Sequence, residues 1–270
     1  MNWLTALILG VVEGLTEYLP VSSTGHLILV GHVLGLRDDD PATSAFEIVI
    51  QLGAILAVIA YYRALLAGHL RGLLRRNAES WRLLVALLIA FFPAAVIGLA
   101  FSKAIEAHLF GPHPVALALM LGGVVMIVVE RLRARSGARG DDGLDRVTPF
   151  RALLIGLGQC VSLWPGSSRS MCTIVSAQLS GLSTATAAEF SFLLAIPTLG
   201  AATIYKGYKA HAVLASQVGS VSMAVGLLAS FVVGWAVVAG FLRYLRTRGL
   251  EPFGWYRIAL GALVLWLLSS

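Results

Sequence analysis

The sequence predicts an all-α integral membrane protein with an inverted-topology repeat, each half of which holds one re-entrant helical hairpin and three transmembrane helices. Three observations predict this class. Hydrophobic residues make up 58% of the 270 residues, charged residues 13%, and the mean hydropathy is +0.84, far from the composition of a soluble domain. A polar motif lies between apolar stretches too short to span a bilayer, and a similar pattern returns in the second half. We therefore treat residues 1–270 as a single membrane domain.

The net charge of +6 does not predict a nucleic-acid partner, because the basic residues lie in short loops between apolar spans, where membrane orientation accounts for them. We expect no cleavable signal peptide, since the first stretch lacks a basic region and continues directly into acidic residues. Cys160 and Cys172 lie in apolar segments without the spacing of metal ligands, and we expect inert thiols.

The first re-entrant hairpin is expected over residues 2–36. Its centre reads EGLTEYLPVSSTGH, from Glu13 to His26, and the apolar runs on either side are shorter than the roughly 20 residues of a membrane span. Glu13 and Glu17 are four positions apart on a helical pattern, so both carboxylates face the same way. The first helix should end just before Pro20.

The second helix of this hairpin should begin at Ser22 or Ser23, because either serine is a good N-cap. The free backbone N–H groups of Ser23, Thr24 and Gly25, together with the helix dipole, would then favour an anion. His26 lies one turn after Ser23, so its imidazole and that hydroxyl share a face. Ionisable residues at membrane depth are costly, which favours a functional site. A helix cap alone, or a structural ion pair between one glutamate and an arginine, is the alternative interpretation.

Three spans complete the first half, residues 1–131; they are expected over 46–62, 83–100 and 114–130. The connecting loops are an acidic one at 37–41, a basic one at 63–82 and a short one holding Lys103 and Glu106.

The second half, residues 150–270, follows a charged loop at 131–149. It starts with a hairpin over 150–182, which breaks at Pro165 and has a polar turn from Gly166 to Ser170. Its spans are expected over 187–205, 216–242 and 255–269.

A shift of 145 residues places the Pro-Val-Ser-Ser-Thr sequence at 20–24 on the Pro-Gly-Ser-Ser-Arg sequence at 165–169, and a shift of 142 places Glu47 on Glu189. An odd number of spans in each half inverts the second half, so the two polar turns should face each other near the bilayer midplane. Glu47, Gln51 and Glu189 either line the cavity between them or hold the packing of the spans.

The positive-inside rule indicates the orientation. The basic loops at 63–82, 131–151 and 243–257 hold most of the lysines and arginines, which predicts that they are cytoplasmic and that both termini lie outside.

Arg169 is set apart in the second polar turn and needs an anionic partner. This is either a carboxylate, Glu13 or Glu17, or a substrate phosphate that the planar guanidinium grips with two bonds, and we favour the phosphate.

These residue types predict phosphoryl transfer or hydrolysis on a lipid phosphate or diphosphate that reaches the site from the bilayer. Glu13 and Glu17 suit a divalent cation, Mg²⁺ or Ca²⁺. Arg169 and the turn amides would hold phosphate. Ser23 could attack phosphorus while His26 takes its proton, or His26 could position a water or protonate the leaving oxygen. The rival hypotheses are a secondary transporter, and a protein that combines hydrolysis with lipid-carrier movement across the bilayer.

The motifs EGLTEYLPVSSTGH and WPGSSRSMCTI, followed by FEIVIQLGAILAV and AAEFSFLLAIP respectively, resemble the undecaprenyl-diphosphatase family, also described as bacitracin-resistance proteins. The resemblance covers essentially the whole chain. It implies hydrolysis of undecaprenyl diphosphate to undecaprenyl phosphate and inorganic phosphate, which recycles the lipid carrier of cell-wall synthesis. It also implies a divalent-cation requirement, a location in the bacterial plasma membrane and a site that opens to the outer face.

Matched by position, the resemblance implies that the paired acids are Glu13 and Glu17, the nucleophile Ser23, the histidine His26 and the phosphate-gripping arginine Arg169. The other residues expected to bind substrate phosphate are Ser22, Thr24, Ser168, Ser170 and Thr173. The family usually has glycine where this chain has the bulkier Met171. A homodimer is left open.

Overall fold

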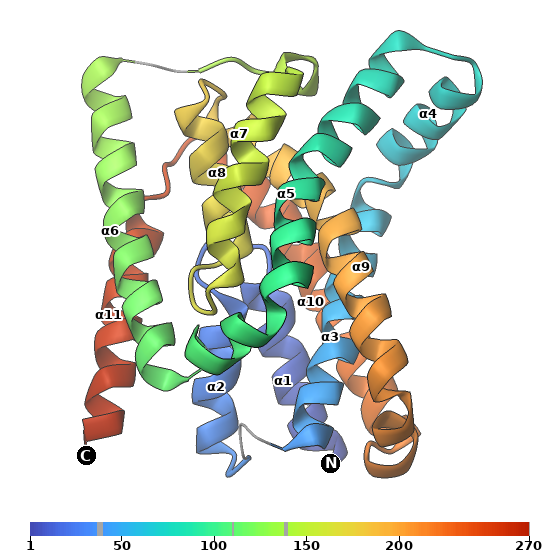
Figure 1. Ribbon diagram of the computed structural model, residues 1–270, viewed down its shortest axis with the longest axis vertical. Helices are drawn as coiled ribbons and strands as arrows, with labels where there is room; N and C mark the ends of the chain where they lie inside the picture. The colour runs from blue at the N-terminus through green and yellow to red at the C-terminus, as the bar shows by residue number, and fades with distance from the viewer. Residues whose placement is uncertain (37–39, 110, 138–139, 270) are drawn as a thin grey trace.

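The computed structural model describes residues 1–36, 40–109, 111–137 and 140–269 (Figure 1). Within these ranges the chain forms helices and no β-strand. The acidic loop predicted at 37–41 falls partly on residues 37–39, which lie outside the described residues. Five helices are long and apolar enough to cross a membrane, namely α3, α5, α6, α9 and α10.

The first hairpin consists of α1 (Trp3–Thr16) and α2 (Ser23–Val33). Asn2 caps α1 by accepting a hydrogen bond from the Thr5 N–H at 2.8 Å. The helix ends at Thr16, ahead of Pro20, and α2 begins at Ser23 with Ser22 as its N-cap. The predicted break before Pro20 and the predicted start of the second helix are both confirmed.

The spans expected in the first half fall on α3 (Pro41–Tyr61), α5 (Ala78–Leu109) and α6 (Pro112–Ser136).

Two predicted loops are wrong. Lys103 and Glu106 lie within α5, because no Gly or Pro interrupts the good helix formers after Gly98. The basic loop at 63–82 contains a further helix, α4 (Arg63–Leu74), which has no buried residue and lies beside α5 (Figure 1).

The second half begins with the 3₁₀ turn η1 (Leu144–Arg146). The second hairpin follows as α7 (Pro149–Gln159), η2 (Cys160–Leu163) and α8 (Arg169–Leu179). Three long helices complete the chain: α9 (Thr184–Gln217), α10 (Ser220–Leu245) and α11 (Glu251–Ser269). The span expected from residue 216 begins four residues later, because 216 and 217 still belong to α9.

The two polar turns end in the same backbone geometry. Ser22 has φ 71° and ψ 102°, and Ser168 has φ 71° and ψ 114°; each caps an 11-residue helix. Positive φ is rare for serine, and such positions cost about 1–3 kcal/mol. The caps correspond at a shift of 146, one more than the shift that superposes the prolines. Ser23 therefore corresponds to Arg169, since each is the first residue of its helix.

In Figure 1 the hairpin α1–α2 opens toward the end of the molecule where both termini lie, and α7–α8 opens toward the opposite end. The tips of the two hairpins meet in the middle. This is the arrangement that an inverted repeat predicts, although the repeat itself stays a prediction. Glycines allow close helix contacts around the hairpins: Gly10 and Gly14 of α1 lie against the backbone of Gly226 and Ser230 in α10.

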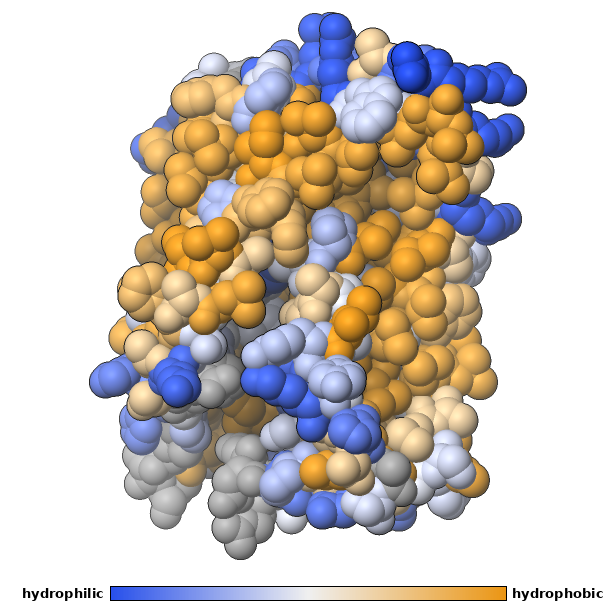
Figure 2. All heavy atoms as spheres, turned by 45° about the vertical axis from the view of Figure 1, so that its right-hand side comes forward, coloured by the Kyte–Doolittle hydropathy of each residue, from blue (hydrophilic) through white to orange (hydrophobic). Residues whose placement is uncertain are grey.

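The surface matches a bilayer. Figure 2 shows an extensive apolar surface, with hydrophilic residues gathered at the top edge and in the lower part of this face. Large side chains such as Leu99, Phe92 and Trp266 are more than half exposed. Helices satisfy their own backbone groups, so they tolerate this apolar environment. The chain is thus a multi-pass membrane protein.

Candidate active site

Glu17 joins the two polar turns. One of its carboxylate oxygens, Oε2, accepts a hydrogen bond from the Ser23 hydroxyl at 2.7 Å, and the other, Oε1, accepts one from Nη2 of Arg169 at 3.0 Å. The side chains of Glu17 and Arg169 are only 6% and 8% exposed, so this ion pair is buried. Residues 152 positions apart in the chain are brought together, and the two turns face each other as the sequence predicts.

Arg169 contacts Ser191 and Tyr18 in addition to Glu17, and its Nε is left without a partner among the described residues. Its Nη1 donates to the backbone oxygen and the hydroxyl of Ser191, at 3.2 and 3.3 Å, and its guanidinium lies 5.6 Å from the ring centroid of Tyr18. Its Nε is buried and has no hydrogen-bond partner among the described residues. A buried donor of this kind suits an incoming acceptor such as a phosphate oxygen.

Ser191 of α9 was not predicted to belong to the site. Its hydroxyl also bonds that of Thr173, at 2.6 Å, and is fully buried. The sequence carries a signal for it: Ser191 is a small polar residue in the apolar segment that begins α9, two positions after the embedded Glu189.

The predicted phosphate ligands of the second turn mostly hold the turns together. The Ser170 hydroxyl donates to the backbone oxygen of Leu19 in the first turn at 2.9 Å, and lies 3.0 Å from the Ser168 hydroxyl. Thr173 donates to the backbone oxygen of Arg169 at 2.8 Å. Ser22 is likewise buried as a cap, whereas Thr24 is half-buried.

His26 has partners other than Ser23. Its Nδ1 lies 2.7 Å from the backbone oxygen of Ser22 and its Nε2 lies 2.6 Å from the hydroxyl of Tyr256 in α11. The Ser23 hydroxyl donates to Glu17 instead. The group placed to take the proton of Ser23 is therefore the Glu17 carboxylate, which differs from the predicted pairing of Ser23 with His26 one turn later.

Glu13 lies in the same buried region. It is 2% exposed, and the charged groups that act on it are Glu17, Glu47 and Arg169. Three carboxylates against one arginine repel one another unless a cation or proton is present, which fits a cation site. Among the described residues, no group of three or more His, Cys, Asp and Glu side chains is arranged to hold a metal ion. A cation bound here would need oxygen ligands from the substrate as well.

Arg257 contacts both polar turns, which the sequence did not predict. It was counted in the basic loop at 243–257, but it lies in α11 and is fully buried. Its Nη1 donates to the Pro20 carbonyl at 3.2 Å, and its Nη2 donates to the carbonyls of Gly166 and Ser167 at 2.9 and 3.1 Å. It also bonds two carbonyls of α6, where Gly122 leaves the space for its guanidinium.

The sequence carries a signal for Arg257. It is a lone arginine among the aromatic and apolar residues of the last span, and a charge inside a span needs polar partners, as Arg169 does.

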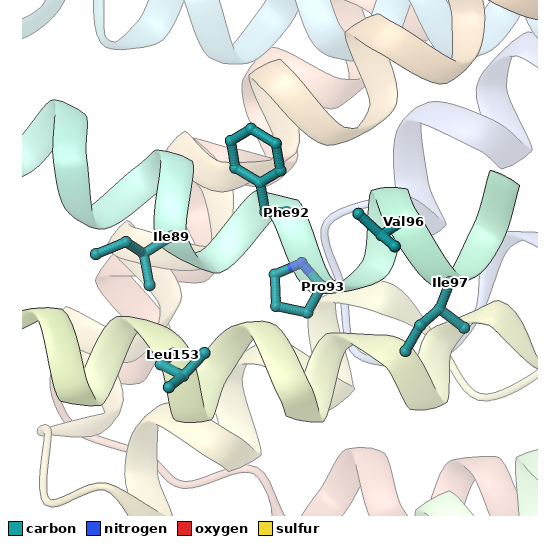
Figure 3. A pocket seen from close by; sticks show the side chains of 6 residues that line it. All are labelled: Ile89, Phe92, Pro93, Val96, Ile97 and Leu153. Carbon is teal, nitrogen blue, oxygen red and sulfur yellow. The ribbon is translucent and has the colours of Figure 1, made fainter. Parts of the chain in front are cut away.

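The other embedded polar residues lie outside this cluster. The Gln51 carbonyl accepts from the Thr203 hydroxyl at 3.1 Å, which ties α3 to α9 and favours the packing role. Glu189 interacts with the charge of Arg246 and with Tyr62 rather than with the turns. An apolar hollow of about 470 Å³ opens beside Pro93 between α5 and α7 (Figure 3), but no predicted site residue lines it.

Comparison with known proteins identifies relatives over nearly the whole chain. The family model of the bacitracin resistance protein BacA matches residues 6–263. A protein of Sorangium cellulosum named undecaprenyl-diphosphatase is 61% identical over 268 residues, covering 99% of this chain and 87% of that protein. Undecaprenyl-diphosphatase 2 of Rhodospirillum rubrum is 49% identical over 96% of this chain and 93% of its own length. An undecaprenyl-diphosphatase of a Thermoanaerobacter species is 47% identical, covering 98% and 96%.

Proposed function

This chain belongs to the family of the bacitracin resistance protein BacA, and from that premise we propose that it hydrolyses undecaprenyl diphosphate to undecaprenyl phosphate and inorganic phosphate. The relatives' names favour hydrolysis over the transporter hypothesis. The observation that carries the proposal is the buried contact of Glu17 with both Ser23 and Arg169, since it unites a hydroxyl nucleophile, its base and a phosphate-binding cation in one site.

In the proposed reaction, the unpartnered Nε of Arg169 binds the terminal phosphate together with the first backbone N–H groups of α2 and α8. The N–H groups of Gly25 and Met171 are excluded, because they donate to the cap serines Ser22 and Ser168. The Ser23 oxygen attacks the terminal phosphorus and its proton moves to Glu17. The bridging P–O bond breaks, and its electron pair leaves with undecaprenyl phosphate. Arg169 offsets the charge that develops on the phosphoryl oxygens.

In the second half of the proposed reaction, a water molecule hydrolyses the phosphate ester on Ser23. Its oxygen attacks the phosphorus bound to Ser23 and its proton moves to Nε2 of His26. The P–O bond to Ser23 breaks, and the Ser23 oxygen recovers the proton held by Glu17. His26 later releases its proton to the departing phosphate or to solvent. The alternative is direct attack of a water on the diphosphate, with Ser23 as a ligand of the phosphate.

We further propose that the reaction requires Mg²⁺ or Ca²⁺. Glu13 and Glu17 would hold the cation together with phosphate oxygens of the substrate, and the cation would neutralise part of the diphosphate charge. The buried carboxylates around Glu13 support this, since they accumulate negative charge that a cation offsets.

The expected setting is the bacterial plasma membrane, where the product re-enters cell-wall synthesis. We propose a single membrane domain of two inverted halves, 1–131 and 150–270, with both termini on the outer side and the site open to the outer face. The lipid substrate would enter from the bilayer. A homodimer stays a hypothesis.

The test is phosphate release from undecaprenyl diphosphate by the purified protein in detergent, with chelator and with metal restored. The variants are Glu17→Gln and Arg169→Ala, and the matched control is Arg131→Ala, which removes an exposed arginine paired with Glu251. We expect chelator-sensitive release that falls at least a thousandfold in both site variants and stays within about twofold in the control. No release from the folded, metal-restored wild type would overturn the proposed function.

A further inference from the structure

The C-terminal helix brings a partly exposed tyrosine to the candidate active site. Tyr256 is 45% exposed, and its hydroxyl lies 2.6 Å from Nε2 of His26, 230 residues away in the chain. The two rings are nearly parallel, 9° apart, with centroids 5.6 Å apart. Neither motif of the sequence contains Tyr256, and none of the catalytic steps above uses it.

The hydrogen bonds of His26 determine which of its ring nitrogens carries the proton. A backbone carbonyl only accepts, so Nδ1, at 2.7 Å from the Ser22 oxygen, carries a hydrogen. In the neutral ring Nε2 is then unprotonated, and the Tyr256 hydroxyl donates to it. Ser22 keeps its carbonyl in place because it is the N-cap of α2.

This arrangement prepares His26 for the second half of the reaction. Since Glu17 is the base for Ser23, His26 is left to accept the proton of the attacking water. Only an unprotonated Nε2 can do so. Tyr256 is partly exposed, so its bond to Nε2 can be exchanged for one from an incoming water molecule.

We propose that Tyr256 is a positioning residue for His26, an inference that rests on the proposed hydrolysis. Its hydroxyl and ring hold the imidazole in place with Nε2 unprotonated, until a water molecule takes the place of the hydroxyl at Nε2. When Nε2 accepts the water's proton, the Tyr256 hydroxyl turns and accepts the new N–H. The rate of turnover therefore depends on Tyr256 through His26, while binding of the diphosphate by Arg169 does not.

The decisive experiment is a double-mutant cycle on the purified full-length protein, with undecaprenyl diphosphate as substrate. Tyr256→Phe keeps the ring and removes the hydroxyl. We expect it to lower kcat about threefold to tenfold, with KM within twofold of wild type. In a His26→Ala background the same change should have no further effect, because the group that Tyr256 positions is absent.

Trp255→Phe is the matched control. Trp255 is the adjacent residue of α11, is also exposed, and its indole N–H donates to Glu251 rather than to the site. Trp255→Phe should leave kcat unchanged.

Two outcomes would overturn the inference. One is a Tyr256→Phe enzyme with wild-type kcat, and the other is a Tyr256→Phe change that lowers kcat by the same factor in the wild-type and His26→Ala backgrounds. Hydrolysis by the wild type is measured in parallel. If the wild type releases no phosphate, the proposed function fails, and this result is distinct from an unchanged kcat in Tyr256→Phe.

A spectroscopic measurement covers the case in which His26→Ala has no measurable activity. The ¹⁵N signals of the His26 ring, assigned by their loss in His26→Ala, report which nitrogen is protonated. We expect an unprotonated Nε2 whose signal moves in Tyr256→Phe and does not move in Trp255→Phe. An Nε2 signal that is the same in all three proteins would contradict the positioning role.

Discussion

At the scale of single residues, the site depends on Glu17 having two different partners at once. Its carboxylate bonds a hydroxyl from its own hairpin and a guanidinium from the other, and both bonds are shielded from water. The same residue thus joins the two hairpins and is the proposed base for Ser23.

The first prediction concerns Ser23. Ser23→Ala removes the proposed nucleophile, and we expect kcat to fall at least a thousandfold because the covalent route is lost. The measurement is steady-state phosphate release. Ser162→Ala is the control, since that hydroxyl donates to the Gln159 carbonyl before the second turn rather than to Glu17 or Arg169. Residual activity within tenfold of wild type would instead support a water as the attacking group.

At the scale of elements, the two short helices α2 and α8 are started by serines in a strained backbone geometry. This geometry turns the chain sharply enough to place the first residues, Ser23 and Arg169, at the tips of the hairpins. The free N–H groups of both helix starts then lie at the meeting point of the hairpins, where they suit an anion.

A second prediction separates strain from capping at Ser22. Ser22→Ala loses the cap bond to the Gly25 N–H, at 3.4 Å, and keeps the strain of φ 71°, whereas Ser22→Gly loses the bond and relieves the strain. We expect Ala to destabilise the protein by about 1–2 kcal/mol and Gly by clearly less. Thermal unfolding in detergent measures both.

Ser180→Ala is the control for that series, because its hydroxyl bonds a helix-end carbonyl at an ordinary φ of −78°. Equal losses of stability for Ala and Gly at position 22 would show that the positive φ stores no strain.

At the scale of the whole molecule, Arg257 holds the two hairpins in register. One buried guanidinium of α11 donates to carbonyls of the first turn, the second turn and α6. No carboxylate pairs with it in the described part of the chain, so its charge is balanced by carbonyl dipoles. Because Pro20 and Ser167 lie close in the chain to Glu17 and Arg169, we expect the contact between Glu17 and Arg169 to depend on Arg257.

The third prediction tests that anchor. Arg257→Met removes the donor from several buried carbonyls, each worth about 1 kcal/mol, so we expect Tm to fall by on the order of 10 °C. Activity should fall at least a hundredfold, and Arg257→Lys should recover part of it because the charge remains. Thermal unfolding and phosphate release measure the two effects. Arg131→Met, in an exposed pair, is the control; an equally small effect of both Met variants would contradict the anchor.

Much of the architecture was predictable because its causes are local. Chain length and hydropathy identify the spans, and a proline followed by serines identifies each hairpin tip. The predictions failed where the local signal is ambiguous. Arg63–Leu74 reads as a basic loop but forms α4, since its leucines also suit a helix at the membrane surface, and the residues around Lys103 contain no helix breaker.

The sequence by itself determined the class of protein, the two polar turns and the residue types that meet in them, because apolar length, helix caps and embedded charges act over a few residues. Only the tertiary structure decided the partners. Ser23 pairs with Glu17, His26 with Tyr256, and Arg257 with both turns. His26 and Tyr256 are 230 residues apart, and Arg257 lies 237 residues from Pro20, so these two choices depend on how distant helices rotate and pack against one another. Ser23 and Glu17 are six residues apart, and their pairing depends on how the first hairpin folds at its turn. Helical periodicity specifies which face a side chain occupies, but it does not specify which distant helix lies opposite that face.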